Sequence, residues 1–139
     1  MAQEITPRFK PGQTLTAYAA AADIEAGRFV VPTAAFNSDG DLPCGHAGAG
    51  DLALGVSQGR AEQSYAQHAQ ERRCPVNTGG VPRVETGAAF AALAPIASDA
   101  SGRAVAAAAG DEILGTALEA STGAGEFAAI QFHPRGLAV

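Results

Sequence analysis

The stretch Ala109-Gly110-Asp111-Glu112-Ile113-Leu114-Gly115 decides the fold, because nearly the same stretch occurs sixty positions earlier as Ala49-Gly50-Asp51-Leu52-Ala53-Leu54-Gly55. Residues 24–60 placed on residues 84–120 without a gap match at 11 of 37 positions. The matching Gly, Asp and Ser residues fall where turns are expected, so the match indicates an internal structural repeat of about 60 residues. We assign the role of structural turn residues to the shared positions Gly50, Asp51, Gly55, Gly110, Asp111 and Gly115.

Short apolar runs bounded by Gly, Asp, Ser or Pro recur at a spacing of about 8–12 residues, which is typical of an all-β barrel or sandwich. The clearest run is Arg28-Phe29-Val30-Val31, which Pro32 ends. Two alanine runs, 88–94 and 104–109, favour helix by propensity alone, but their short length and flanking glycines favour strands. The tail His133-Pro134-Arg135-Gly136 is not expected to continue a strand. The expected strands are Leu15–Tyr18, Arg28–Val31, Leu42–His46, Ala53–Ser57, Cys74–Val76, Val81–Val84, Ala88–Ile96, Gly102–Ala108, Leu114–Ala120 and Phe127–Phe132.

The N-terminal segment, residues 1–14, is polar and is broken by Pro7 and Pro11. Proline biases its predecessor to extended conformations, so no helix is expected to begin there. We predict an extended arm that docks on a neighbouring subunit, with a frayed terminus as the alternative. The remainder, residues 15–139, is predicted to form a single β domain. One short helix over about 62–72 is expected as an insertion into the first repeat, because that stretch contains no Gly or Pro.

The composition predicts a thin core and excludes several function classes. Of 65 apolar residues 33 are alanine, and Val, Ile, Leu and Phe together number only 27. Alanine buries little area, so a partner surface or self-assembly is expected to supplement the core. The net charge of −5 and the single lysine, Lys10, leave no basic stripe for nucleic acid. No run of about eighteen apolar residues exists that would span a membrane, and the start shows no signal-peptide pattern.

No arrangement of residues in the sequence predicts a catalytic or metal site. Cys44 and Cys74 are expected to be free thiols, with a disulfide or a metal pair as the less favoured alternative. His46 lies near Cys44 without a third ligand, and Asn37–Asp41 lacks the downstream glutamate of a calcium loop. The pair Gly79-Gly80 is not followed by a phosphate-binding pattern, and no serine lies in a G-x-S-x-G elbow. We therefore expect no enzyme activity, no metal and no cofactor.

The order of several short motifs resembles the small capsid decoration, or cement, proteins of tailed bacteriophages. The likeness covers most of residues 11–132, and it depends on the order and spacing of elements that are each low in information. These elements are Pro11-Gly12-Gln13-Thr14-Leu15-Thr16, Ile24-Glu25-Ala26-Gly27-Arg28-Phe29-Val30, Gly50-Asp51 with Leu54-Gly55-Val56, Gly80-Val81-Pro82-Arg83-Val84-Glu85, Ser98-Asp99 with Gly102-Arg103-Ala104-Val105, Ala109-Gly110-Asp111 with Leu114-Gly115, and Gly125-Glu126-Phe127.

The resemblance implies a β-barrel-like protein on the outer surface of the capsid in the virion. Such a protein would bind the major capsid protein, associate with itself as a homotrimer near local threefold axes, and stabilise the lattice. A head-fibre base, another tail-associated β-domain and a host-surface carbohydrate-binding module are the alternatives; the absence of Trp and the presence of only two Tyr count against the last. If the arm contacts the capsid, the candidate contact residues are Ile5, Pro7, Arg8, Phe9 and Lys10.

Overall fold

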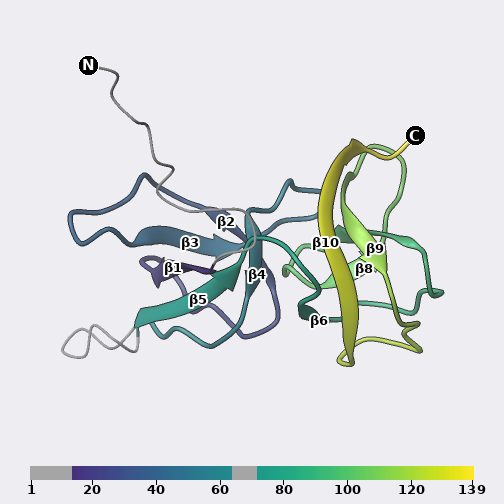
Figure 1. Cartoon of the computed structure of the whole chain (residues 1–139), viewed down its shortest axis with the longest axis horizontal. Coiled ribbons are helices and arrows are strands. Elements are labelled where there is room, and N and C mark those ends of the chain that lie inside the picture. Colours follow the sequence, from purple (N-terminus) through teal and green to yellow (C-terminus); the bar gives the residue numbers. More distant parts are fainter. Residues whose placement is uncertain (1–13, 64–71) are drawn as a thin grey trace, which may run out of the picture.

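A computed structural model describes residues 14–63 and 72–139 of the chain, and within them it confirms the predicted all-β class (Figure 1). The strands are β1 (Thr14–Ala19), β2 (Phe29–Pro32), β3 (Leu42–His46), β4 (Gly55–Ser57), β5 (Arg73–Asn77), β6 (Arg83–Glu85), β7 (Pro95–Ser98), β8 (Ala104–Ala106), β9 (Glu112–Ala117) and β10 (Phe127–Leu137).

The strands form two five-stranded units that lie side by side (Figure 1). The first unit is a closed barrel in the order β1-β3-β2-β4-β5, in which β1 runs parallel to β3 and antiparallel to β5. The second unit has the order β6-β10-β9-β7-β8. A parallel bridge between Thr86 and Ala104 links the ends of this second sheet, so we call the two units the first and second barrel.

The two barrels share one strand topology. Strands β1, β2, β3, β4 and β5 of the first barrel correspond, in that order, to β6, β7, β8, β9 and β10 of the second. The registers agree as well. Val30 pairs with Gly55 on β4, and Ile96 pairs with Gly115 on β9. The parallel pairing of β1 with β3 corresponds to the bridge that links the ends of the second sheet.

The spacing between corresponding residues is not constant along the barrels. Gly55 and Gly115 lie sixty positions apart, whereas Val30 and Ile96 lie sixty-six apart. The offset differs because the loops between corresponding strands differ in length. The gapless alignment of 24–60 on 84–120 therefore matches corresponding residues only in part of each barrel.

Two clusters of buried side chains stabilise the structure, and one of these clusters contains residues of both barrels. The first cluster lies inside the first barrel and includes Ile24 and Val76. The second joins Phe29 of the first barrel to Leu114 and Phe132 of the second, and the rings of Phe29 and Phe132 lie 6.2 Å apart between centroids. Val30 faces into the first cluster, so Phe29 lies on the opposite, outer face of β2. The outer face of the first barrel therefore packs against the core of the second barrel at this point.

Three expectations from the sequence need correction. β10 continues through Pro134 to Leu137, after an irregularity in its pairing with β9 between Phe132 and Gly136. The proline is tolerated because Pro134 lies inside this irregularity, where it has no partner residue on β9, and β6 does not pair with this part of β10 either.

The predicted strand Ala88–Ile96 is largely a turn and loop, and β7 begins only at Pro95. Phe90 and Ser121 form an isolated β-bridge with two backbone hydrogen bonds. This bridge fixes the segment in place, although the segment does not pair with a neighbouring strand along its length. The predicted arm reaches Thr14, but that residue already begins β1.

The rest of the arm and most of the predicted helix, residues 64–71, lie outside the described residues. In the described part of the chain, no helix is long and apolar enough to cross a membrane.

Candidate functional site

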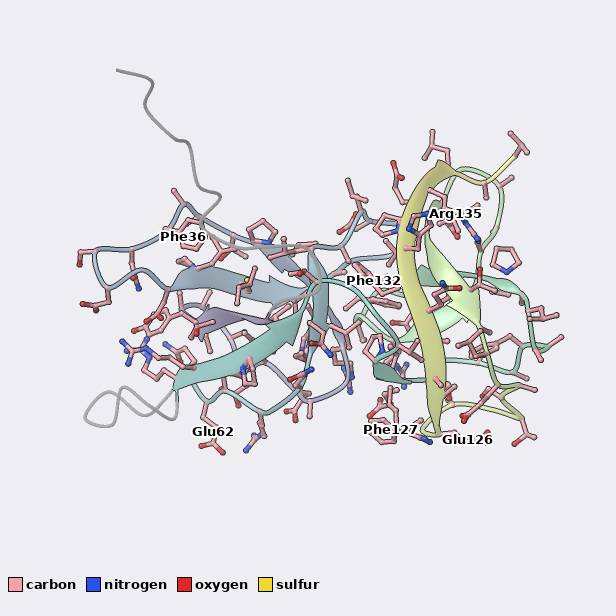
Figure 2. All side chains as sticks on the ribbon, in the orientation of Figure 1. Phe36, Glu62, Glu126, Phe127, Phe132 and Arg135 are labelled. Carbon is pink, nitrogen blue, oxygen red and sulfur yellow. The ribbon has the colours of Figure 1, made fainter. Side chains whose placement is uncertain are left out.

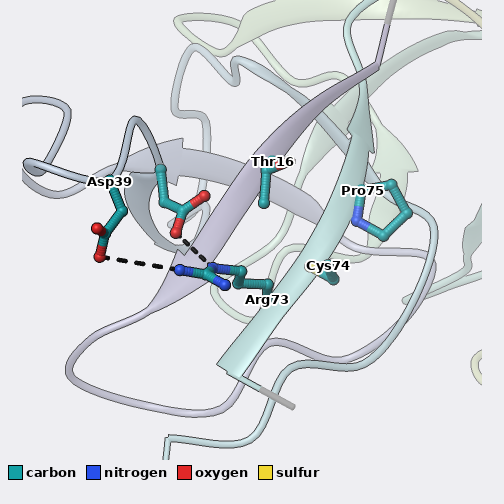
Figure 3. Close-up of a pocket in the computed structure, with 6 residues that line it drawn as sticks. Thr16, Asp39, Arg73, Cys74 and Pro75 are labelled. Carbon is teal, nitrogen blue, oxygen red and sulfur yellow. Dashed lines mark hydrogen bonds and ion pairs between the residues drawn. The ribbon is translucent and has the colours of Figure 1, made fainter. Parts of the chain in front are cut away.

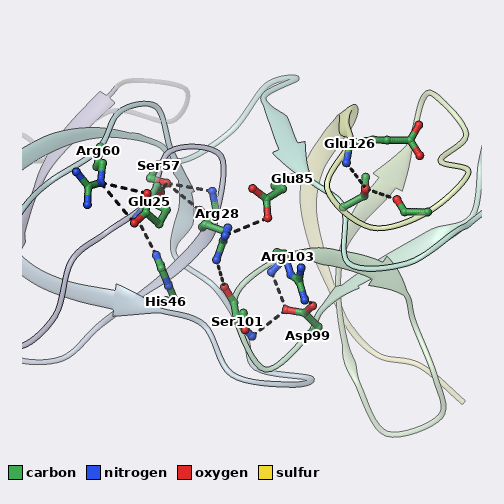
Figure 4. Close-up of polar contacts among 12 residues, drawn as sticks. Glu25, Arg28, His46, Ser57, Arg60, Glu85, Asp99, Ser101, Arg103 and Glu126 are labelled. Carbon is green, nitrogen blue, oxygen red and sulfur yellow. Dashed lines mark hydrogen bonds and ion pairs between the residues drawn. The ribbon is translucent and has the colours of Figure 1, made fainter.

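Polar side chains bind the two barrels together at the start of β2 (Figure 4). The Arg28 guanidinium donates from Nη2 to Glu85 Oε2 of β6 at 3.0 Å and from Nη1 to the Ser101 carbonyl at 2.9 Å. The side chains of Arg28 and Glu85 are only 15% and 21% exposed. A charged pair with this degree of burial is weakly screened by solvent, so it couples the barrels more strongly than a surface pair would.

Backbone hydrogen bonds reinforce this junction. Phe29 N donates to the Gly102 carbonyl at 2.8 Å, and Glu85 N donates to the Gly27 carbonyl at 2.8 Å. A Cβ atom added at Gly102 would lie 2.7 Å from the Phe29 carbonyl oxygen, and this glycine also has a φ of +78°. Glycine is therefore required at this contact, both for its conformation and for the close approach of the two chains.

His46 lies at the edge of the junction and acts as an acceptor. Its Nε2 accepts a hydrogen bond from Glu25 N at 2.9 Å. Burial lowers the pKa of His46, and the nearby charge of Arg28 lowers it further. The ring is therefore held neutral, and its role in the described structure is to satisfy a backbone donor.

An open depression of about 460 Å³ lies beside β1 and β5 in the first barrel (Figure 3). Arg73 enters it and pairs with Asp41 at 2.5 Å and with Asp39 at 3.9 Å. The guanidinium is thus neutralised within the chain. Cys74 also lines the depression, but burial raises its pKa to about 11, so little thiolate exists at neutral pH.

Both cysteines are free and buried in the first barrel. Burial, together with the neighbouring Cys74, raises the pKa of Cys44 to about 12. Over residues 14–63 and 72–139, no group of three His, Cys, Asp or Glu side chains is placed to hold a metal ion. These residues thus offer neither an activated nucleophile nor a ligand set.

The turns singled out from the repeat have matching geometry. Asp51 Oδ2 accepts from Gly48 N at 2.8 Å, and Asp111 Oδ2 accepts from Ala108 N at 2.9 Å. Gly50 and Gly110 both have a positive φ, of 72° and 91°. The aspartates close local turns and reach no ligand site.

The turn role assigned to Gly55 and Gly115 is wrong. They lie in strands β4 and β9, within the strands expected over Ala53–Ser57 and Leu114–Ala120. A Cβ atom would lie 2.2 Å from the Asn77 carbonyl oxygen at Gly55, and 2.1 Å from the Gln131 carbonyl oxygen at Gly115. These glycines permit the close approach of the neighbouring strand in each barrel.

The turns at Asn37–Asp41 and at Ser98-Asp99 are expected from their turn-forming residues, but the correspondence between Asn37 and Asp99 was missed from the sequence. Asn37 Oδ1 accepts from Asp39 N and Asp41 N, and Asp99 Oδ1 accepts from Ser101 N and Arg103 N. The gapless alignment had matched Asp39 with Asp99. The signal that could have found the correct pair is chemical, because Asn and Asp both supply an oxygen that caps a turn.

The outer surface carries several exposed apolar side chains. Eight large apolar side chains of the described residues are exposed, two of them visible as Phe36 and Phe127 in Figure 2. The exposed large apolar residues are Phe36, Leu52, Val81, Leu93, Leu118, Phe127, Leu137 and Val139.

Comparison with known proteins gives a match to the phage cement protein model over residues 9–132. The chain belongs to the phage cement protein family. As a cement-family member it is a structural protein of a phage head. No curated protein matches the chain.

The fold of this cement-family chain is similar to that of a solved phage structure, the head fiber gp8.5 N base of bacteriophage phi29. The TM-score is 0.67, and the match covers 91% of this chain and 98% of that chain. The sequences are 14% identical, so the likeness shows a common fold and no more.

The candidate contact residues of the arm all precede the described part of the chain, so their role stays a prediction. They are Ile5, Pro7, Arg8, Phe9 and Lys10.

Proposed function

We propose that this protein decorates the exterior of a phage head, where it binds the major capsid protein and stabilises the lattice. The observation that carries the proposal is the family match over residues 9–132. The paired barrels support it, because a cluster of buried side chains and a partly buried ion pair join them into one body that could bridge capsid subunits. The protein performs this role by binding, and we assign no chemical reaction to it.

The direct test mixes the purified full-length protein with expanded capsids that lack it. Saturable co-sedimentation at a fixed ratio to the major capsid protein is expected, together with a higher temperature of capsid disruption. A protein that remains in the supernatant at all ratios would remove the proposal.

We further propose that the protein associates as a homotrimer near the local threefold axes. Only 27 of 139 residues are Val, Ile, Leu or Phe, and several of these are exposed in a single chain. Contact between subunits would bury part of this area and supplement the small core. A particle map in which the copies stand apart, with no mutual contact, would exclude the trimer.

The arm is proposed to lie across the major capsid protein or an adjacent copy. Burial of Ile5 or Phe9 would contribute about 1.5–3 kcal/mol each. Exposed pairs made by Arg8 or Lys10 would contribute only about 0.2–1 kcal/mol each. A truncation that lacks residues 2–10 should therefore bind capsids more weakly. Equal binding would show that the segment is only a frayed terminus.

A head-fibre base is the second candidate, favoured by the similarity that extends over 98% of the phi29 head fiber N base. The two roles differ in copy number. Decoration predicts a copy count close to that of the major capsid protein, whereas a fibre base predicts occupancy of a subset of sites. Quantitative protein staining of purified particles distinguishes them.

A further inference from the structure

The strand β10 presents one of its two faces to the outside of the second barrel. Ala128 and Ile130 are buried in the cluster that fills this barrel. Side chains alternate across a strand, so Phe127, Ala129 and Gln131 lie on the opposite, outer face. Phe127 is 47% exposed there.

Two arginines join this outer face from the same sheet. Arg83 on β6 is paired with Ala129, and residues directly opposite each other in antiparallel strands share a face. Thr116 on β9 is paired with Gln131 in the same way. The Arg135 guanidinium donates to Thr116 Oγ1 at 2.8 Å, so it lies on this face too. We call this surface the β10 face; it comprises Arg83, Thr116, Phe127, Gln131 and Arg135.

The β10 face carries a positive charge that the chain does not offset. The two carboxylates beside it already have cationic partners, since Glu85 lies 3.0 Å from Arg28 and Glu119 lies 3.9 Å from Arg83. Arg135 is exposed, and within residues 14–63 and 72–139 it forms no ion pair with a carboxylate. A partner for this face should therefore offer negative charge.

A surface of the opposite charge lies on the first barrel. The isolated bridge between Ile24 and Ala61 joins the segment after β1 to the segment after β4. Both bridge residues are fully buried, so the residues on either side of each point outward. We call these flanking residues the acidic patch; they are Asp23, Glu25, Arg60 and Glu62. The single arginine pairs with all three carboxylates, which leaves two negative charges without compensation.

The acidic patch and the β10 face lie apart in one chain. Figure 2 shows Glu62 beneath the first barrel and Arg135 beside the upper part of β10, in the second barrel. Their charges therefore cannot pair within one molecule. Each chain presents both an unmatched positive surface and an unmatched negative one.

We infer that the β10 face of one copy docks on the acidic patch of a second copy. Opposite charges meet in this contact, although the whole chain has a net charge of −5. The contact joins two different surfaces, and such heterologous contacts close into a ring when the rotation between copies allows it. A homotrimer requires a contact of this kind, because a contact between two identical surfaces stops at a dimer. The assignment rests on the proposed homotrimer and names the surfaces that form it.

The test follows the assembly of full-length protein by sedimentation velocity, from micromolar to millimolar concentration at low salt. Wild-type protein is expected to assemble as its concentration rises. Arg135→Glu and Glu62→Arg should each weaken assembly about tenfold, because each removes an attraction between copies. The matched control is Arg72→Glu, which changes the net charge as Arg135→Glu does, at a guanidinium that lies over the Tyr18 ring. This control should assemble like wild type.

The charge swap separates the contact from folding. Arg135→Glu combined with Glu62→Arg in one chain should assemble more tightly than either single variant, because opposite charges again face each other. Damage to the fold would add up in the double variant and would not give this recovery. A double variant no tighter than the single variants would overturn the inference. A wild-type chain that stays monomeric at every concentration, or an assembly that added salt does not weaken, would overturn it too.

Capsid co-sedimentation of the same variants separates this inference from the proposed function. Loss of capsid binding by Arg135→Glu with unchanged assembly would show that the β10 face contacts the capsid, which refutes the self-contact and leaves decoration standing. Recovery of assembly by the charge swap, in a protein whose wild-type form never binds capsids, would support the self-contact and remove decoration.

Discussion

Replacement of Gly115 by alanine should be among the most damaging small changes in this protein. The new Cβ atom would lie 2.1 Å from the Gln131 carbonyl oxygen and 3.2 Å from Ile130 Cγ2. An ordinary carbon–oxygen contact is about 3.3–3.6 Å, so β10 must move away from β9 by more than about 1 Å. That movement strains the pairing of the longest strand in the described structure.

The expected cost is the sum of overpacking and weakened strand pairing. Overpacking costs about 1–3 kcal/mol, and each hydrogen bond lost from the ladder costs about 0.5–1.5 kcal/mol. Gly115→Ala should therefore lower the free energy of unfolding by about 3–5 kcal/mol, a large part of the 5–15 kcal/mol typical of a domain. Gly55→Ala should behave alike, since its Cβ would lie 2.2 Å from the Asn77 carbonyl oxygen.

Two other glycines provide controls with different physical causes. Gly110 has a φ of +91° and open space around it, so Gly110→Ala should cost only the strain of about 1–2 kcal/mol. Gly123 has open space and no positive φ, so Gly123→Ala should stabilise by about 0.4–1 kcal/mol. Urea unfolding followed by circular dichroism at one protein concentration gives all four values. A Gly115→Ala midpoint close to that of Gly110→Ala would refute the argument from close approach.

Three further predictions concern the junction and the thiols. A double-mutant cycle with Arg28→Ala and Glu85→Ala should give a coupling energy of about 1–3 kcal/mol, and a value near zero would mean that the pair does not join the barrels. The pKa of His46 is lower in the folded chain than its ordinary value of 6.5. As the pH falls below 6.5, His46 in the unfolded chain is therefore protonated before His46 in the folded chain. The free energy of unfolding should be constant above pH 6.5 and decrease as the pH falls from 6.5 toward the folded-state pKa. His46→Gln should flatten this dependence, and equal curves for the variant and wild type would contradict the assignment. The raised pKa of about 12 for Cys44 implies that its thiolate fraction at pH 8 is about a thousandfold below that of an ordinary thiol. Labelling with a thiol reagent should therefore be slow until urea unfolds the chain. Fast labelling of both thiols in the native protein would count against their burial.

The sequence predicted the strands best where apolar residues lie between strong turn formers. Leu42–His46 was predicted with the observed bounds, and the run that ends at Pro32 is β2. Such strands are encoded locally, by alternation and by the residues that end them.

Features that depend on neighbouring strands were not predictable from the sequence. Pro134 lies inside β10 because the strand is unpaired at that residue, which a single sequence does not reveal. The segment 88–94 is predicted as a strand, but the residues that hold it, Ser121 and Ala117, are distant in sequence. The ion pair of Arg28 with Glu85 joins residues 57 positions apart, and nothing in the local pattern marks either side chain.

The shared cluster of buried side chains has a mechanical consequence. Phe29 and Phe132 sit in one cluster that spans both barrels, and Gly102 closes against the backbone of Phe29. A force that pulls the barrels apart must therefore expose buried aromatic rings. The chain should respond to tension as one unit with a single rupture event, and a cut in the linker between β5 and β6 should leave the two halves clasped.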